Sequence, residues 1–146
     1  SHLRIPPAQR HKEPLIVILA KADCWIHNIP EIDLESEPFV VDGESGRSVL
    51  DHDRIMAASE ACESFLSRHC PEFVATARGF SEEVVYVPVS AIGTSPEAVE
   101  KDGSMFIGIR PSEIKPRWST VPFNLALEGE LNSLATTPTK SGGTTA

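Results

Sequence analysis

The stretch PLIVILAKAD, residues 14–23, decides the fold of this chain, because an unbroken apolar run ends there in the charged residues Lys21 and Asp23. A second apolar run, VVYVPV at residues 84–89, ends in the same abrupt way at Ser90. Both runs are short, rich in β-branched residues and without polar alternation, which is typical of strands buried on both faces of a parallel sheet. Ligands of open α/β sheets bind beyond the carboxyl ends of such strands, so we expect the two polar ends to form one site.

Helical patterns separate and follow the two apolar runs. Apolar residues recur at helical spacing within residues 49–69, and Pro71 is expected to end that helix. Weaker patterns predict a short helix at residues 71–77 and a last helix at residues 121–134, with an edge strand or loop at residues 104–116. Strands that alternate with helices predict an α/β fold, which we expect to be a three-layer, mainly parallel sheet with flanking helices.

The rest of the chain divides by composition. Residues 1–13 are polar and predict a connector, residues 14–135 form the predicted domain, and residues 136–146 are a Thr/Gly/Ser/Lys tail that we expect to be disordered. Within the domain, residues 25–48 are acidic and interrupted by proline and glycine, so we interpret them as an inserted lid that is more mobile than the strands. Residues 93–103 are predicted to be a loop.

Charge and cysteine content narrow the class of protein. The 146 residues include 13 basic and 21 acidic side chains, for a net charge of −8, which argues against binding to nucleic acid or to an anionic membrane surface. No apolar run approaches the ~18 residues of a membrane helix, and the first residues show no signal-peptide pattern. The three cysteines do not suggest a disulfide framework, so we expect a cytoplasmic protein with buried or half-buried thiols.

The two polar ends resemble the guanine-reading motifs of P-loop GTPases, in which one buried strand ends in [NT]-K-x-D and a later strand ends in S-A. The matching strings are ILAKAD and VPVSAIG. The resemblance implies that Asp23 accepts hydrogen bonds from the guanine N1–H and N2 amine, and that the Lys21 stem packs along the base and ribose. It also implies that the Ala91 N–H binds guanine O6 and that Ser90 orients Asp23. A carboxylate suits two adjacent donors, which adenine does not offer.

The sequence also departs from the family pattern. Ala20 stands where the family has Asn or Thr, so the polar bridge from that side chain to the phosphate loop is lost. The spacing between the two motifs is longer than in compact small GTPases, and the predicted lid accounts for the difference. No G-x-x-x-x-G-K-[ST] motif cradles the phosphates, and no D-x-x-G motif holds Mg²⁺. Residues 42–48, DGESGRS, imitate the phosphate loop, but Arg47 replaces its lysine, and we interpret the stretch as a turn-forming loop.

The resemblance thus implies the C-terminal half of a divergent GTPase domain of the translation-factor-related class, with a partial P-loop NTPase-like fold. GTP or GDP would be bound by the whole domain, and the phosphate loop, switches and Mg²⁺ would belong to a half upstream of Ser1. No catalytic residue, no metal ligand and no GTPase activity are expected of this chain alone. The competing hypothesis is a non-enzymatic interaction module with a degenerate nucleotide fold, which presents residues 25–48 to a protein partner.

The residues alone also allow a plainer interpretation of the two motifs. Asp23 is then a turn or helix-cap residue, Lys21 a solvated charge and Ser90 an ordinary strand exit. Cys24 and His27 have the spacing of half a metal site, but no matching second half is visible in the sequence.

Overall fold

The computed structural model describes residues 10–136. Its elements are β1 (Leu15–Leu19), α1 (Ala22–Trp25), η2 (Ile26–Asn28), β2 (Phe39–Val41), β3 (Ser48–Leu50), α2 (His52–His69), α3 (Pro71–Phe80), β4 (Val84–Pro88), β5 (Glu97–Lys101), β6 (Ser104–Gly108), η3 (Pro111–Glu113) and α4 (Val121–Thr136). No helix within the described range is long and apolar enough to cross a membrane.

The two predicted strands, β1 and β4, are adjacent and parallel, with Leu15 opposite Val84 and Leu19 opposite Pro88. This pair confirms the α/β class. The other two strand pairs in the described part of the chain, β2–β3 and β5–β6, are antiparallel and form separate two-stranded sheets. The described residues therefore do not form one mainly parallel sheet. Hairpin β5–β6 replaces the loop expected at residues 93–103. Its turn residues Asp102 and Gly103 both have positive φ, which is the conformation that an Asp-Gly hairpin turn requires.

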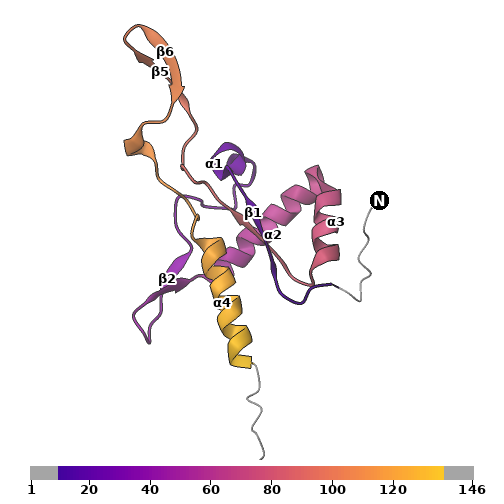
Figure 1. Ribbon diagram of the computed structural model, residues 1–146. Helices are drawn as coiled ribbons and strands as arrows, with labels where there is room; N and C mark the ends of the chain where they lie inside the picture. The colour runs from indigo at the N-terminus through magenta and orange to yellow at the C-terminus, as the bar shows by residue number, and fades with distance from the viewer. Residues whose placement is uncertain (1–9, 137–146) are drawn as a thin grey trace, which may run out of the picture.

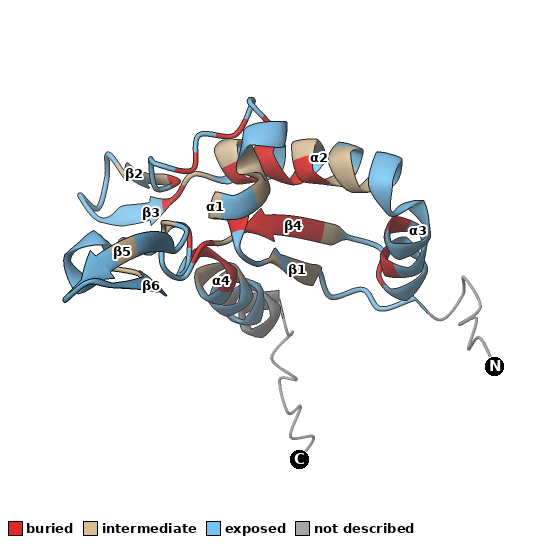
Figure 2. Ribbon diagram, turned by 90° about the horizontal axis from the view of Figure 1, so that it is seen from above, coloured by how far each residue is buried: buried red, intermediate tan, exposed pale blue. Residues whose placement is uncertain are grey.

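The core lies between β4 and helix α2, which covers the strand (Figure 2). Ile55, Ala58 and Cys62 are buried side chains of α2, and the apolar stripe predicted for this helix is confirmed. Between them, the Ser59 hydroxyl accepts a hydrogen bond of 2.9 Å from the backbone N–H of Tyr86 in β4. Strand β1 is less covered: its strand neighbour among the described residues is β4 alone, and Ile18 remains 56% exposed.

The helix ends differ from their predicted positions for local reasons. Helix α2 begins at His52 rather than at residue 49, because the Asp51 carboxylate caps it by accepting a hydrogen bond from the Arg54 N–H at 3.1 Å. Val49 belongs instead to β3. Helix α3 continues through Gly79 to Phe80, so that glycine does not close it as the sequence predicts.

The predicted lid, residues 25–48, consists of two unlike parts. Its first part is packed into the core, where Ile29, Ile32 and Leu34 are buried. Its second part is the exposed hairpin β2–β3, whose turn includes the stretch that imitates a phosphate loop. In that turn the Asp42 carboxylate accepts a hydrogen bond from the Ser45 N–H at 2.9 Å, as expected of a turn.

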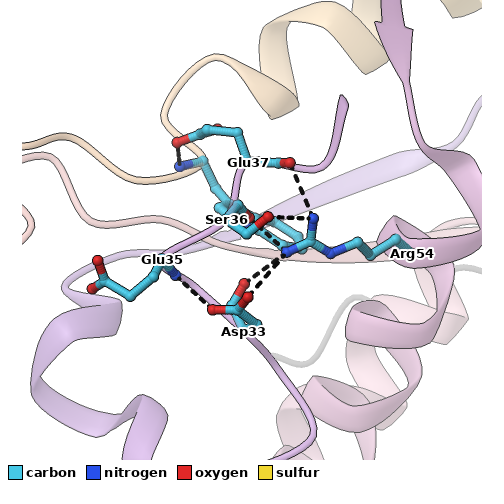
Figure 3. A network of polar contacts seen from close by, with 6 residues as sticks. Asp33, Glu35, Ser36, Glu37 and Arg54 are labelled. Atoms are coloured by element: carbon cyan, nitrogen blue, oxygen red, sulfur yellow. Dashed lines mark hydrogen bonds and ion pairs between the residues drawn. The ribbon is translucent and has the colours of Figure 1, made fainter. Parts of the chain in front are cut away.

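Arg54 makes most of the polar contacts that hold the packed part in place (Figure 3). Arg54 donates hydrogen bonds to the backbone carbonyls of Asp33 at 3.0 Å, Ser36 at 2.6 Å and Glu37 at 3.0 Å. The guanidinium also lies 5.6 Å from the centroid of the buried Trp118 ring, at cation–π distance. Trp118 adds two contacts of its own, a 2.9 Å bond from its N–H to the Glu37 carboxylate and a 3.0 Å bond from its indole to Ser36 O.

Hairpin β5–β6 has no comparable anchor and projects away from the body of the molecule (Figure 1). Its residues Met105, Phe106 and Ile107 are all exposed. Residues 1–9 and 137–146 lie outside the described part of the chain. Most of the predicted connector falls there, as does the predicted tail except for Thr136, which is the last residue of α4.

Candidate functional site

The site begins in the turn that joins β1 to α1. Lys21 has φ 54° and ψ 41°, in the left-handed region that residues other than glycine rarely adopt. Such a conformation costs about 1 kcal/mol or more, and Asp102 and Trp118 have positive φ as well. The turn is fixed on either side of Lys21: the Ala22 N–H donates to Val89 O at 3.0 Å, and the Trp25 indole donates to Ala20 O at 2.9 Å. The Lys21 side chain is left exposed beyond the carboxyl end of β1.

The structure brings the two sequence motifs together. Ser90, which follows β4 and is fully buried, donates a hydrogen bond from its hydroxyl to Oδ1 of Asp23. The same hydroxyl accepts a bond of 2.8 Å from the Gly93 N–H. The expected meeting of the two motifs at the same end of neighbouring parallel strands is thus confirmed. The orienting contact of Ser90 on Asp23, which the resemblance implies, is present in the structure.

The loop after β4 is fastened to a distant part of the chain. Ser90 and Arg117 exchange backbone hydrogen bonds of 3.1 and 2.8 Å, and the Lys115 N–H donates to Ile92 O at 2.7 Å. Gly93 has φ +80°, and a Cβ at this position would lie 1.8 Å from Lys115 O. Glycine is therefore required both by conformation and by the close approach of backbone. Sequence reasoning missed this support, because nothing in residues 115–117 signals a long-range pairing.

Two further side chains complete the site, and neither was predicted to join it. The Ser95 hydroxyl donates to Oδ2 of Asp23 at 3.2 Å, and the Cys24 thiol approaches the same oxygen at 3.4 Å. Cys24 Sγ and Ser95 Oγ are 3.6 Å apart. Cys24 directly follows Asp23, and this adjacency in the sequence could have suggested it. Nothing in the sequence points to Ser95, because its position depends on the path of the loop that follows β4 and pairs with residues 115–117.

These donors set the charge of the site. The hydrogen bond from Ser90 lowers the pKa of the Asp23 carboxyl below its ordinary value, and burial opposes this more weakly. The bonds from Cys24 and Ser95 lower the pKa further. Asp23 is therefore ionised at neutral pH and acts only as an acceptor. Beside it, Ala91 is exposed, and within residues 10–136 its backbone N–H has no hydrogen-bond partner.

The arrangement can recognise a ligand edge that carries two adjacent donors and a neighbouring acceptor. The carboxylate oxygens of Asp23 accept, the Ala91 N–H donates, and the Lys21 stem supplies an apolar surface with a positive end. The described residues of this site therefore fit the recognition of such an edge.

The remaining candidate residues have other surroundings. His27 contacts the amide of Asn28 at 3.2 Å, and residues 10–136 hold no group of three His, Cys, Asp or Glu side chains able to bind a metal. Of the cysteines, Cys62 is buried, which raises the pKa of its thiol to about 12. Cys24 and Cys70 are exposed, so the expectation of buried or half-buried thiols is wrong for these two. Cys24 lies in the short helix α1, and Cys70 lies between α2 and α3, past the helical turns that bury Cys62.

No protein-family model, curated protein or solved structure matches this chain. A functional proposal therefore depends on the site geometry and on the sequence motifs.

Proposed function

We propose that this chain is the guanine-recognition half of a GTP-binding, P-loop GTPase-like domain. The observation that carries the proposal is the Asp23 carboxylate, held by the buried Ser90 hydroxyl where two neighbouring parallel strands end. Base recognition requires a carboxylate fixed before the ligand arrives, because a mobile side chain would lose conformational entropy on binding. The short chain of contacts from β4 through Ser90 to Asp23 provides that rigidity.

Each residue of the site has a role in this proposal. Asp23 accepts from the N1–H and the N2 amine of guanine, the Ala91 N–H donates to O6, and Lys21 packs along the base. Adenine would leave the ionised carboxylate facing a ring nitrogen without a hydrogen, which is a costly mismatch in a desolvated contact. The position of Lys21 supports the proposal, because this exposed residue lies just beyond the end of β1 and two residues before Asp23.

The phosphates of GTP or GDP, and Mg²⁺, would be held by a part of the parent protein outside these residues. The turn at residues 42–47 joins β2 to β3 and offers no phosphate cradle. The finer fold, a three-layer and mainly parallel sheet, is likewise a proposal for the parent domain. An apolar groove beside β1 and α4, lined in part by Ile16, Ile18 and Phe123, supports it by offering space for further elements.

The test is a titration with guanosine monophosphate (GMP) followed by amide NMR, because the isolated base contacts predict weak binding. We expect shifts at Lys21, Asp23 and Ala91 with GMP and weaker binding of adenosine monophosphate (AMP). Asp23→Asn should weaken GMP binding about tenfold or more, since it removes charge-assisted bonds worth about 1.5–3 kcal/mol each.

The matched control for this titration is Asp53→Asn. Asp53 lies in the first turn of α2, as Asp23 lies in the first turn of α1, and it is exposed. This control should bind GMP like the natural chain. Equal affinity for GMP and AMP, unchanged by Asp23→Asn, would contradict the proposal.

A second candidate function is a non-enzymatic interaction module. The exposed side chains of Met105, Phe106 and Ile107 on hairpin β5–β6 favour it, because isolated two-stranded hairpins with apolar faces are only marginally stable in water. Burial of Ile29, Ile32 and the residues near them moves the candidate surface from the predicted lid to this hairpin. If the titration showed no preference for GMP over AMP, the interaction module would be the better supported of the two functions.

A further inference from the structure

The two oxygens of the Asp23 carboxylate are unequally occupied. Each carboxylate oxygen can accept two hydrogen bonds. Oδ1 accepts from Ser90, whereas Oδ2 faces both the Ser95 hydroxyl at 3.2 Å and the Cys24 thiol at 3.4 Å. A ligand edge with two adjacent donors needs one free acceptor direction on each oxygen. The Ser95 and Cys24 contacts leave Oδ2 without one.

We propose that the Ser95 hydroxyl is a displaceable gate on Asp23: it occupies the acceptor direction that the guanine N2 amine requires, and it must leave before a two-donor base can bind. This inference rests on the proposed guanine-binding function and adds a residue that determines the strength of binding. The gate keeps the carboxylate satisfied in the empty site, and its hydrogen bond is exchanged for that of the ligand.

Ser95 is the donor most easily given up. Ser90 is fully buried and also accepts from the Gly93 N–H, so its loss would disrupt the loop after β4. Cys24 directly follows Asp23 in α1, so its thiol stays beside Oδ2 while that helix is formed. Ser95 is exposed and lies beyond Gly93, outside the backbone bonds that fasten the loop to residues 115–117.

The chain beyond Ser95 also permits the movement. It leads directly into hairpin β5–β6, which projects from the body and packs mainly against itself (Figure 1). A small displacement at Ser95 would therefore disturb few tertiary contacts. The stem below it, between Ser90 and Gly93, would keep its place and continue to hold Asp23.

The experiment compares GMP and AMP binding to the natural chain and to Ser95→Ala, by amide NMR titration. We expect Ser95→Ala to bind GMP about three- to tenfold more tightly, which is the fold-change for releasing one hydrogen bond of ordinary net strength. The preference for GMP over AMP should be kept. Ser104→Ala is the matched control: Ser104 is exposed in β6, and its side chain makes no hydrogen bond within the described residues, so GMP affinity should not change.

A second readout follows the carboxyl carbon of Asp23 through an acid titration. Loss of the Ser95 hydrogen bond in Ser95→Ala should raise the pKa of Asp23 toward its ordinary value. The control Ser104→Ala keeps that bond and should leave the pKa of Asp23 unchanged. With that shift observed, unchanged or weaker GMP binding by Ser95→Ala would overturn the gate and leave guanine recognition intact. Absence of a GMP preference in both proteins would instead refute the proposed function, and the gate with it.

Discussion

One insertion follows β1 and another follows β4, the two strands whose carboxyl ends form the candidate site. The two insertions differ in how they pack against the rest of the molecule. The chain after α1 folds back, buries Ile32 and Leu34, and is fastened by Arg54. The chain after β4 projects as hairpin β5–β6, with Ile107 84% exposed. Both insertions contain apolar residues, so hydrophobicity alone does not explain the difference. An irregular segment can be buried only where its backbone groups find partners, and Arg54 supplies donors to three carbonyls at once.

The largest test of this comparison is Arg54→Ala. We expect it to lower the free energy of unfolding by about 2–4 kcal/mol, because several backbone carbonyls lose a charged donor together and Trp118 loses a stacked cation. Urea unfolding measures the change. Arg54→Lys should recover only part of it, since an ammonium lacks the planar fork. Arg47→Ala, at an exposed turn, is the control and should be nearly neutral; equal effects of the two alanine variants would break the comparison.

The second test compares two glycines of positive φ, one at the fastened root of the projecting insertion and one at its tip. Gly93→Ala should cost about 3 kcal/mol, because strain in φ adds to the overlap of the new Cβ with Lys115 O. Gly103→Ala should cost about 1 kcal/mol, since φ is +76° but no atom lies within 4 Å of the new Cβ. Thermal unfolding of both variants gives the difference. Equal losses of stability in the two variants would mean that the chain around Gly93 is no more tightly packed than the turn at Gly103.

Amide hydrogen exchange sharpens the comparison along the chain. We expect residues 29–38 to exchange more slowly than β5 and β6, because the former are covered by core contacts and the latter bond mainly to each other. The sequence predicts mobility for all of residues 25–48, whereas the structure leads us to expect it only in the turn between β2 and β3. Faster exchange in residues 29–38 than in hairpin β5–β6 would show that the Arg54 contacts do not hold the segment in solution.

A smaller, pH-dependent effect links the site to the fold. The pKa of Asp23 is lower in the folded chain than its ordinary value, chiefly through Ser90, so the ionised carboxylate contributes stability above the ordinary pKa. That contribution is lost as the pH falls through the lowered value. The difference in unfolding free energy between the natural chain and Asp23→Asn should therefore shrink from neutral to acid pH. A difference independent of pH would show that Asp23 is not stabilised as an anion.

The smallest expected effect is that of Phe106→Ser in β6. Phe106 is exposed and pairs across the hairpin with Val99, so its loss should change the free energy of unfolding by less than about 0.5 kcal/mol. Urea unfolding checks this value, with Trp118→Phe as the buried comparison. A loss of more than about 2 kcal/mol at Phe106 would mean that the hairpin is packed against the body after all.

The sequence predicts those parts of the fold that depend on local pattern. The apolar runs at residues 15–19 and 84–88 and the stripe of α2 fix the parallel pair and its cover, and the polar ends place Asp23 beside Ser90. The Asp-Gly pair at residues 102–103 also has the sequence signature of a hairpin turn, which the loop predicted at residues 93–103 does not take into account. The carbonyl ligands of Arg54, the pairing at residues 115–117 and the position of Ser95 were not readable, because each joins residues far apart in a chain without a repeating pattern there.

The Ser59–Tyr86 hydrogen bond helps to determine which edge of the β1–β4 sheet can pair with a further strand. In a parallel ladder alternate residues turn their amides away from the partner, and in β4 these include Tyr86 and Pro88. Ser59 already binds the Tyr86 N–H, and Pro88 has none to offer, so a further strand cannot add at β4. Within residues 10–136, the outward amides of Ile16 and Ile18 on β1 have no hydrogen-bond partner. A further strand, from a parent protein or from another chain, is therefore expected to join this sheet only at the β1 edge.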